Sequence, residues 1–344
     1  MPELRLNPVT HRWIVTGKRR VMPDVQDADV LCPFCPGNER LTPKSISETR
    51  DPSGAWTTRV FHDRAPIFQI EGALNPRAEG IYDLMNTLGA HEIVVETPQH
   101  GVTLAQLPVE HAARVIEVCR NRILDLKQDR RFRCVSVFKN QRPVSRTLQG
   151  HSHFHVLASP VLPQVLQIEF RWSLAHFRRK ERCLYCDIVD QEVHQEKRVV
   201  DQNADFIAFC PFSSRSPYEL WILPLRHSSA FEKDLGEPAR VRSLAPFLKN
   251  CLQRIENISP SLHIVVHTEP NLAARGWPQG WWGTIAEDFH WHLEINPAIE
   301  DERRVLGSEG FYFNPIPAEE AAVVLRALTP GAEHVPAREV TPSG

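Results

Sequence analysis

The sequence lacks the features that would place it in a membrane or on a polyanion. No apolar stretch approaches the ~20 residues that a helix needs to span a bilayer, and the first thirteen residues, MPELRLNPVTHRW, contain no apolar core of a signal peptide. The formal net charge is only −2 over 344 residues, which gives no global attraction to nucleic acid or to a membrane surface. We therefore expect a cytoplasmic protein with neither membrane nor nucleic acid as a partner.

Eight cysteines are present, and half of them form closely spaced pairs. Disulfides are rare in a reducing cytoplasm, so the pairs Cys32-Pro-Phe-Cys35 and Cys183-Leu-Tyr-Cys186 need another explanation. The remaining four stand singly within apolar runs, which favours buried, inert side chains; they are Cys119, Cys134, Cys210 and Cys251.

The chain repeats one order of elements twice. After the first cysteine pair we expect a strand, an amphipathic helix and two further strands, at 91–96, 109–130, 133–138 and from 151. After the second pair the same order recurs at 218–223, 237–255, 263–267 and from 290. A period of about 150 residues indicates a duplication and not a solenoid array of short repeats.

The repeat predicts an α+β fold made of two duplicated modules. We expect mainly antiparallel sheet with helices packed on one side, and a pseudo-two-fold axis between the modules. The expected boundaries are 1–165 for the N-terminal module, 166–182 for a connecting helix, 183–330 for the C-terminal module and 331–344 for a flexible tail.

Each cysteine pair has two histidines at matching positions. Two cysteines separated by two residues can offer both thiolates to one tetrahedral ion, which then needs two more ligands. The duplicated order predicts two structural zinc sites per chain, each with four protein ligands, formed by Cys32, Cys35, His100 and His151, and by Cys183, Cys186, His227 and His290. A redox role for the two pairs is the alternative.

His151, His153 and His155 alternate along one expected strand, so their side chains share a face. With His151 assigned to metal, His153 and His155 remain available for chemistry. A neutral imidazole can attack phosphorus, form a covalent phosphoramidate and leave again. Three structural histidines are the alternative interpretation of this pattern.

Sequence motifs along nearly the whole chain resemble those of the galactose-1-phosphate uridylyltransferase family of the histidine triad superfamily. The string CPFCPGNE at 32–39 is highly specific, whereas the other matches are modest individually and persuasive together. They are RLNPVT at 5–10, ETPQH at 96–100, VFKN at 137–140, GFYFNP at 310–315 and EEAA at 319–322.

The resemblance implies roles for individual residues and a fold of two histidine-triad-like modules. His153 would become nucleotidylated, Asp63 would hold the nucleotide ribose, and Asn140 would contact phosphate. The resemblance also implies a homodimer in which the partner's C-terminal strand completes each active site.

The second cysteine pair makes the chain most similar to the two-zinc, nucleoside-diphosphate-sugar phosphorylase branch. Other members use a metal site of one glutamate and three histidines, to which Glu169, His267, His290 and His292 correspond. We favour the set with Cys183 and Cys186, because thiolates outcompete carboxylates for zinc.

Three departures from the family concern the phosphate-binding region. His155 stands where the transferases usually have Gln, and a histidine there resembles the hydrolase branch of the superfamily. The small loop before the motif is replaced by 144–150, in which Arg146 could compensate as a charge. His62 replaces the Asn before Asp63, and an arginine-rich N-terminal patch is shortened to Arg19 and Arg20.

These observations predict a ping-pong nucleotidyltransferase. It would move a nucleoside monophosphate between a nucleoside-diphosphate sugar and a sugar phosphate or phosphate, through His153 and with the help of His155. One alternative is a histidine-triad nucleotide hydrolase, which His155 favours. The other is a zinc-stabilised nucleotide-binding protein with impaired catalysis.

Overall fold

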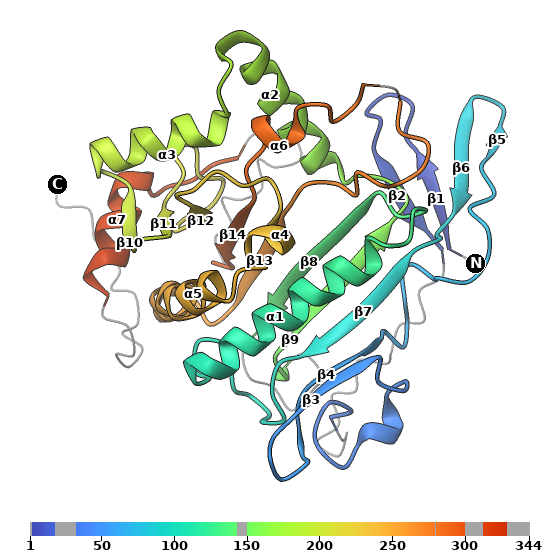
Figure 1. Ribbon diagram of the computed structural model, residues 1–344, viewed down its shortest axis with the longest axis horizontal. Helices are drawn as coiled ribbons and strands as arrows, with labels where there is room; N and C mark the ends of the chain where they lie inside the picture. The colour runs from blue at the N-terminus through green and yellow to red at the C-terminus, as the bar shows by residue number, and fades with distance from the viewer. Residues whose placement is uncertain (1, 18–31, 143–149, 279, 300–311, 329–344) are drawn as a thin grey trace.

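The computed structural model describes residues 2–17, 32–142, 150–278, 280–299 and 312–328. In this part of the chain one large antiparallel sheet carries most of the fold (Figure 1). Across the sheet its strands are, in order, β10 (Val199–Gln202), β11 (Phe206–Phe209), β12 (Leu220–Pro224), β14 (His292–Pro297), β13 (Leu262–His267), β8 (Cys134–Gln141), β9 (His153–Ser159), β7 (Ala90–Val95), β4 (Trp56–His62) and β3 (Ser47–Arg50).

The order of strands shows the predicted pseudo-two-fold relation. Strands β8 and β13 pair at the centre of the sheet, and outward from them β9, β7, β4 and β3 match β14, β12, β11 and β10. Phe138 lies opposite Val265 at the centre of this strand pair. When the two strands are exchanged about that centre, each residue pair on one side of it falls on a pair on the other side. On the same register Phe138 also pairs with His155, and Val265 with Glu294. The predicted α+β fold of joined modules is therefore confirmed.

Two long helices cover one face of the sheet. Helix α1 (Val109–Leu126) lies over the N-terminal half and α5 (Pro238–Ile258) over the C-terminal half, and the two helices contact each other (Figure 1). Apolar residues recur along α1 at three- and four-residue intervals, which makes one stripe of the helix bury against the sheet. Both helices join one hydrophobic core that spans the two modules.

In addition to the predicted layer, helices of the described residues cover the opposite face in the C-terminal half. Helices α2 (Gln164–Lys180), α3 (Leu184–Gln195) and α6 (Ile285–Asp288) pack there. Alternation along β11 shows the two layers, because Phe206 joins the core under α5 whereas Ile207 joins the core under α2 and α3. Helix α2 occupies the segment that we expected to connect the modules.

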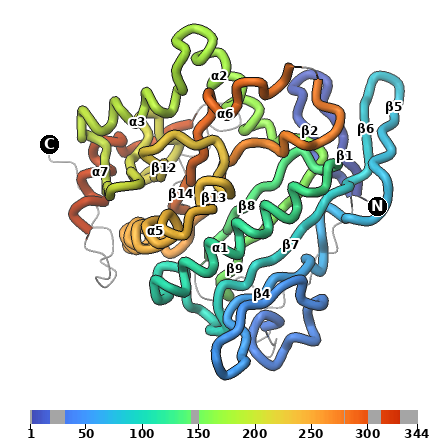
Figure 2. Tube along the Cα trace, viewed as in Figure 1, coloured from blue at the N-terminus to red at the C-terminus, as the bar shows by residue number. Residues whose placement is uncertain are grey.

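The remaining elements lie at the edges. A small sheet has the order β2 (Trp13–Thr16), β1 (Glu3–Leu6), β6 (Tyr82–Asn86) and β5 (Arg77–Glu79). Helix α7 (Ala318–Ala327) lies beside β10 (Figure 1), and Figure 2 shows it far from β1. The short helices are η1 (Glu39–Leu41) and α4 (Phe231–Asp234). None of the described helices has the length and apolar character of a membrane-spanning segment.

Candidate active site and metal centres

The histidines of β9 face away from the helix layer. Phe154 and Val156 are buried in the core under α1, so the alternating side chains of His153 and His155 project from the other face. No helix of the described chain covers that face in the N-terminal half, where the cluster around Phe34 packs instead. The two histidines are partly exposed on this face of the sheet.

The backbone of its own strand fixes the proton position on His153. Nδ1 of His153 lies 2.6 Å from the carbonyl oxygen of His151. Because a carbonyl only accepts hydrogen bonds, Nδ1 carries the proton, and the Nε2 lone pair of neutral His153 is available. Burial lowers the pKa of His153 below its ordinary value, which keeps the ring neutral near pH 7. Phe34, from the first cysteine pair, contacts the ring edge-on at 5.2 Å between centroids.

A pocket opens beside the end of β9. It is lined by residues 101–103, 139–142 and 150–153, which include Asn140 and His153. The Oδ1 atom of Asn140 accepts a hydrogen bond from Nδ1 of His263, on the neighbouring strand β13, at 2.7 Å. The structure therefore brings the predicted nucleophile and the predicted phosphate ligand to one pocket. The altered loop with Arg146, and the pair Arg19 and Arg20, lie outside the described residues.

Asp63 lies beside His155 and not in this pocket. Its carboxylate is 3.2 Å from Nδ1 of His91, on β7, and it also accepts a hydrogen bond from the amide of Ala65 at 2.9 Å. Nε2 of His91 is in turn 3.0 Å from Nδ1 of His155. The neighbouring departure from the family, His62, is exposed.

His91 was not among the predicted site residues. It begins the expected strand 91–96, and alternation places it on the same face as Val95, which pairs with His153. The available signal was a histidine at an alternating position of that strand. Its partner His155 is stacked on Phe138, with ring centroids 5.0 Å apart and planes 13° apart.

The first predicted metal group is assembled from three separate segments. Its four ligand atoms lie within 4.8 Å of one another. Nδ1 of His151 is 3.5 Å from Sγ of Cys32 and 3.6 Å from Sγ of Cys35, and Nδ1 of His100 is 3.5 Å from Sγ of Cys35. Cys32, Cys35, His100 and His151 could therefore hold one metal ion.

The second predicted group has the same arrangement. Sγ of Cys186 is 3.3 Å from Nδ1 of His227 and 3.7 Å from Nδ1 of His290, and Cys183 completes the set. The pKa of Cys186 lies well below its ordinary value, because Cys183 hydrogen-bonds to it and both imidazoles lie beside it. A thiol that ionises readily suits a metal ligand.

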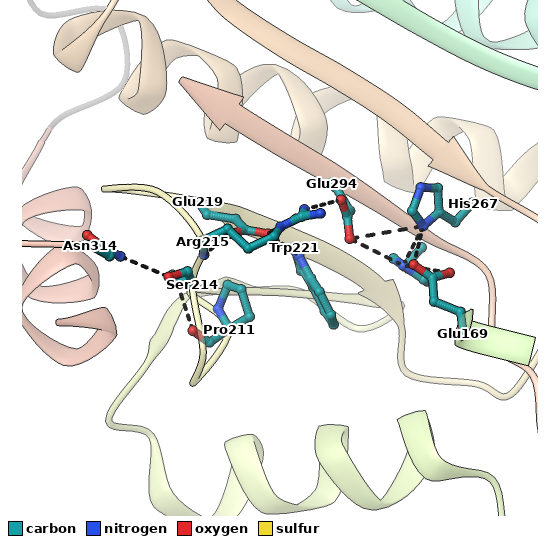
Figure 3. Close-up of polar contacts among 10 residues, drawn as sticks. Glu169, Pro211, Ser214, Arg215, Glu219, Trp221, His267, Glu294 and Asn314 are labelled. Carbon is teal, nitrogen blue, oxygen red and sulfur yellow. Dashed lines mark hydrogen bonds and ion pairs between the residues drawn. The ribbon is translucent and has the colours of Figure 1, made fainter. Parts of the chain in front are cut away.

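The glutamate-and-histidine set implied by other family members is divided by the structure. His290 belongs to the cysteine group, whereas Glu169, His267 and His292 gather with Glu294 instead. Figure 3 shows Glu169, His267 and Glu294 of this second group. Nδ1 of His267 is 3.0 Å from Oε1 of Glu169 and 3.1 Å from Nε2 of His292. The two candidate metal groups therefore share no residue, and the cysteine group does not exclude the other.

The sheet register makes His292 the counterpart of His153, and Glu294 the counterpart of His155. Nδ1 of His292 donates to the carbonyl of His290 at 3.1 Å, as in the first module. His292 is nevertheless completely buried, between Tyr185 of α3 and Trp221 of β12.

An ion-pair network extends from this closed position. Arg215 donates to Glu219 at 2.8 Å and to Glu294 at 2.5 Å (Figure 3). The side-chain amide of Asn314 donates to the carbonyl of Ser214 at 3.2 Å. Of these two corresponding histidines, His153 is partly exposed whereas His292 is buried.

The fold and these groups define an α+β protein of two joined modules, with a partly exposed histidine beside a pocket and two cysteine–histidine groups that could hold metal ions. Residues 3–163 match the family model of the galactose-1-phosphate uridyl transferase N-terminal domain. This match confirms, for the N-terminal part of the chain, the resemblance that the sequence predicts.

Curated relatives extend the similarity to nearly the whole chain. An ADP-glucose phosphorylase of Arabidopsis thaliana is 26% identical, over 95% of this chain and 93% of the relative. A galactose-1-phosphate uridylyltransferase of Thermotoga maritima is 25% identical, over 95% of this chain and 98% of the relative. Both are nucleotidyltransferase-type enzymes, which confirms the predicted enzyme class.

Solved structures show the same relationship. A uridylyltransferase structure superposes with a TM-score of 0.76 at 25% identity, covering 94% of this chain and 97% of that one. The ADP-glucose phosphorylase from Arabidopsis thaliana with bound ADP-glucose superposes with a TM-score of 0.72 at 25% identity, covering 96% and 100%.

Proposed function

We propose that the chain transfers a nucleoside monophosphate between a nucleoside-diphosphate sugar and a sugar phosphate or phosphate. The hydrogen bond from Nδ1 of His153 to the carbonyl of His151 carries this proposal, because it leaves the Nε2 lone pair as the nucleophile. The relatives, a uridylyltransferase and an ADP-glucose phosphorylase, support the same class of reaction.

The reaction proceeds by two displacements at phosphorus. Nε2 of His153 attacks the α-phosphorus, the N–P bond forms, and the bond to the bridging oxygen breaks, so that the sugar phosphate leaves with the electron pair. An oxygen of the second phosphate or sugar phosphate then attacks the same phosphorus, and His153 leaves as a neutral imidazole. Throughout, the carbonyl of His151 holds the proton on Nδ1 and stabilises the charge that the ring carries in the intermediate.

Substrate contacts follow from the pocket and the resemblance. Asn140 contacts the phosphates, since it lines the pocket with His153, and Asp63 and His155 lie along the same face toward β7. The substrate class is a nucleotide sugar, as for the relative solved with ADP-glucose. The homodimer and its partner's C-terminal strand remain predictions.

The two cysteine groups fit structural zinc. With Zn–S of about 2.3 Å and Zn–N of about 2.0–2.1 Å, sulfur and nitrogen ligands of a tetrahedral ion lie about 3.6 Å apart. The five S···N separations of 3.3–3.7 Å match that edge. Nε2 of His151 and of His227 donate to the carbonyls of Thr97 and Ala286, which turns both Nδ1 lone pairs toward the thiolates.

Labelling of the protein tests the proposal. Incubation with UDP-glucose or ADP-glucose carrying a radioactive α-phosphate should place an acid-labile label on the peptide that contains His153. His153→Asn should abolish the label. Saturable binding of both nucleotide sugars without any label would instead support the reading of a catalytically impaired nucleotide-binding protein.

A further inference from the structure

Two of the side chains that line the pocket beside His153 carry a full positive charge at neutral pH, Lys139 and Arg142. Among the described residues, no carboxylate belongs to the lining of this pocket. A nucleoside-diphosphate sugar brings two negatively charged phosphates to the same place. The surroundings of each cation therefore decide which of them can bind the substrate.

Lys139 is already paired inside the protein. Its Nζ atom donates to Glu96 at 2.7 Å and to Ser152 at 2.6 Å, and both side chains of the ion pair are almost fully buried. The ring of Phe154 lies beside the same atom, with its centroid 5.4 Å from Nζ. The carboxylate of Glu96 thus neutralises this charge, and Lys139 is not available to a substrate.

Arg142 has the opposite surroundings. It follows Phe138 and Asn140 at alternating positions, and it lies one residue beyond the end of β8. Its side chain is exposed, and in the described part of the chain no carboxylate forms an ion pair with it. Arg142 therefore brings a positive charge, not neutralised by these residues, to the pocket that also contains Asn140 and His153.

We infer that Arg142 binds the phosphoryl group that is exchanged in the reaction: the distal phosphate of the nucleotide sugar as it leaves, and the incoming phosphate or sugar phosphate. The inference rests on the proposed function. When the α-phosphorus lies at Nε2 of His153, the second phosphate of a diphosphate must lie next to it. A guanidinium group suits this ligand, because its planar fork can donate two parallel hydrogen bonds to phosphate oxygens.

The exposure of Arg142 favours the exchanged phosphate over the α-phosphate as its ligand. The nucleotidyl group stays bonded to His153 between the two displacements, whereas the distal phosphate has to leave for solvent and a second phosphate has to enter. The residue that binds the exchanged group must therefore be reachable from solvent, as Arg142 is. The same guanidinium group stabilises the charge of the leaving oxygen, which takes the electron pair of the broken O–P bond.

Nucleotide binding without turnover tests the assignment. In a His153→Asn background, where the proposed bond to phosphorus cannot form, calorimetry measures the affinities for ADP and AMP and for UDP and UMP. Only the diphosphates carry the distal phosphate. For whichever base binds, Arg142→Gln should weaken binding of the diphosphate at least about tenfold, the size of a charge-assisted hydrogen bond, and should change that of the monophosphate less than about threefold.

Two further variants separate the contact from a general effect of charge. Arg142→Lys keeps the charge but not the fork, so its loss of affinity should be smaller than that of Arg142→Gln. Arg114→Gln removes a positive charge from the exposed side of α1, which covers the other face of the sheet, and should leave the affinities unchanged. With His153 intact, Arg142→Gln should raise the KM for inorganic phosphate at least about tenfold, at an unchanged melting temperature.

Three results would overturn the inference: an unchanged diphosphate affinity in Arg142→Gln, an equal loss for diphosphate and monophosphate, and an equal loss in Arg114→Gln. With a label on His153, any of them would contradict the inference and leave the proposed function in place. The expected difference between diphosphate and monophosphate without a label on His153 would contradict the proposed function alone, because binding of the distal phosphate needs no covalent intermediate. Absence of binding of all four nucleotides would contradict both.

Discussion

The carbonyl of His151 holds Nδ1 of His153 at 2.6 Å, and the side chain of the same His151 points its Nδ1 at the thiols of Cys32 and Cys35. One residue thus joins the first candidate metal group to the proposed nucleophile. A metal ion bound there would fix the side chain of His151, and the carbonyl of the same residue fixes the tautomer of His153. The cysteine motif and His153 are therefore parts of one structural unit.

Removal of Cys32 should remove one metal ion. Cys32→Ser is expected to lower the zinc content from about two to about one per chain and to lower the melting temperature, because structural zinc binding is coupled to folding. Elemental analysis of protein purified without added metal measures this. Cys134→Ser, a buried cysteine outside both groups, should keep both ions, and a stably folded protein without zinc would refute the assignment.

Variants of His151 and His153 should separate an effect on stability from an effect on catalysis. His153→Asn is expected to abolish nucleotidyl transfer with unchanged zinc content and melting temperature. His151→Asn should first lose zinc and stability, and activity only as a consequence. The measurements are metal analysis, thermal melting and transfer rate on both variants; indistinguishable metal content and melting would show that the division of roles along β9 is wrong.

A buried ion pair lies beside the start of β9. Lys139 donates to Glu96 at 2.7 Å, and Ser152 donates to the second oxygen of Glu96, with both charged side chains almost fully buried. Lys139→Met should lower the free energy of unfolding, measured with denaturant, by about 3–5 kcal/mol, because it leaves the carboxylate of Glu96 buried without its ion-pair partner. The double variant with Glu96→Gln should recover part of that loss.

The surface pair of Arg131 and Asp129 is the control for this ion pair. Arg131→Met should cost less than about 1 kcal/mol. If Lys139→Met lowered the free energy of unfolding no more than Arg131→Met does, burial would not make the ion pair of Lys139 and Glu96 more stabilising than a surface pair.

Glu256 should make the protein less stable at neutral pH than a neutral side chain would. Burial raises the pKa of Glu256, although Gln141 donates to it at 2.8 Å and Thr103 at 3.2 Å. Since the folded pKa lies above the unfolded one, its protonation stabilises the fold at low pH, and this contribution is lost as the pH rises through the folded pKa.

Glu256→Gln should therefore melt at a higher temperature than the unmodified chain at pH 7. The difference should shrink as the pH approaches the unfolded value of about 4.3. Glu117→Gln, on the exposed side of α1, should show no such trend. A difference in melting temperature that does not depend on pH would count against a buried charge at Glu256.

Some parts of the structure could be predicted because they follow from patterns among residues that are close in the sequence. The strands alternate and α1 has a helical stripe, so their types and order were visible, as was the duplication. The two metal groups were also predictable, because each set of cysteines and histidines recurs at matching positions in the two halves. The division of His290 from Glu169, His267 and His292 was left open, since spacing places His290 and His292 on the same strand near both groups.

The chain's sequence by itself determined the two modules, the two candidate ligand sets and the strand of alternating histidines, because each depends on residue type and short-range periodicity. The tertiary structure alone decided that His91 joins Asp63 to His155, since three strands must pair in register before those side chains meet. It also decided that His153 is partly exposed whereas its counterpart His292 is buried. Helices α2 and α3 bury the second face of the C-terminal half, and that packing depends on apolar contacts between residues far apart in the chain.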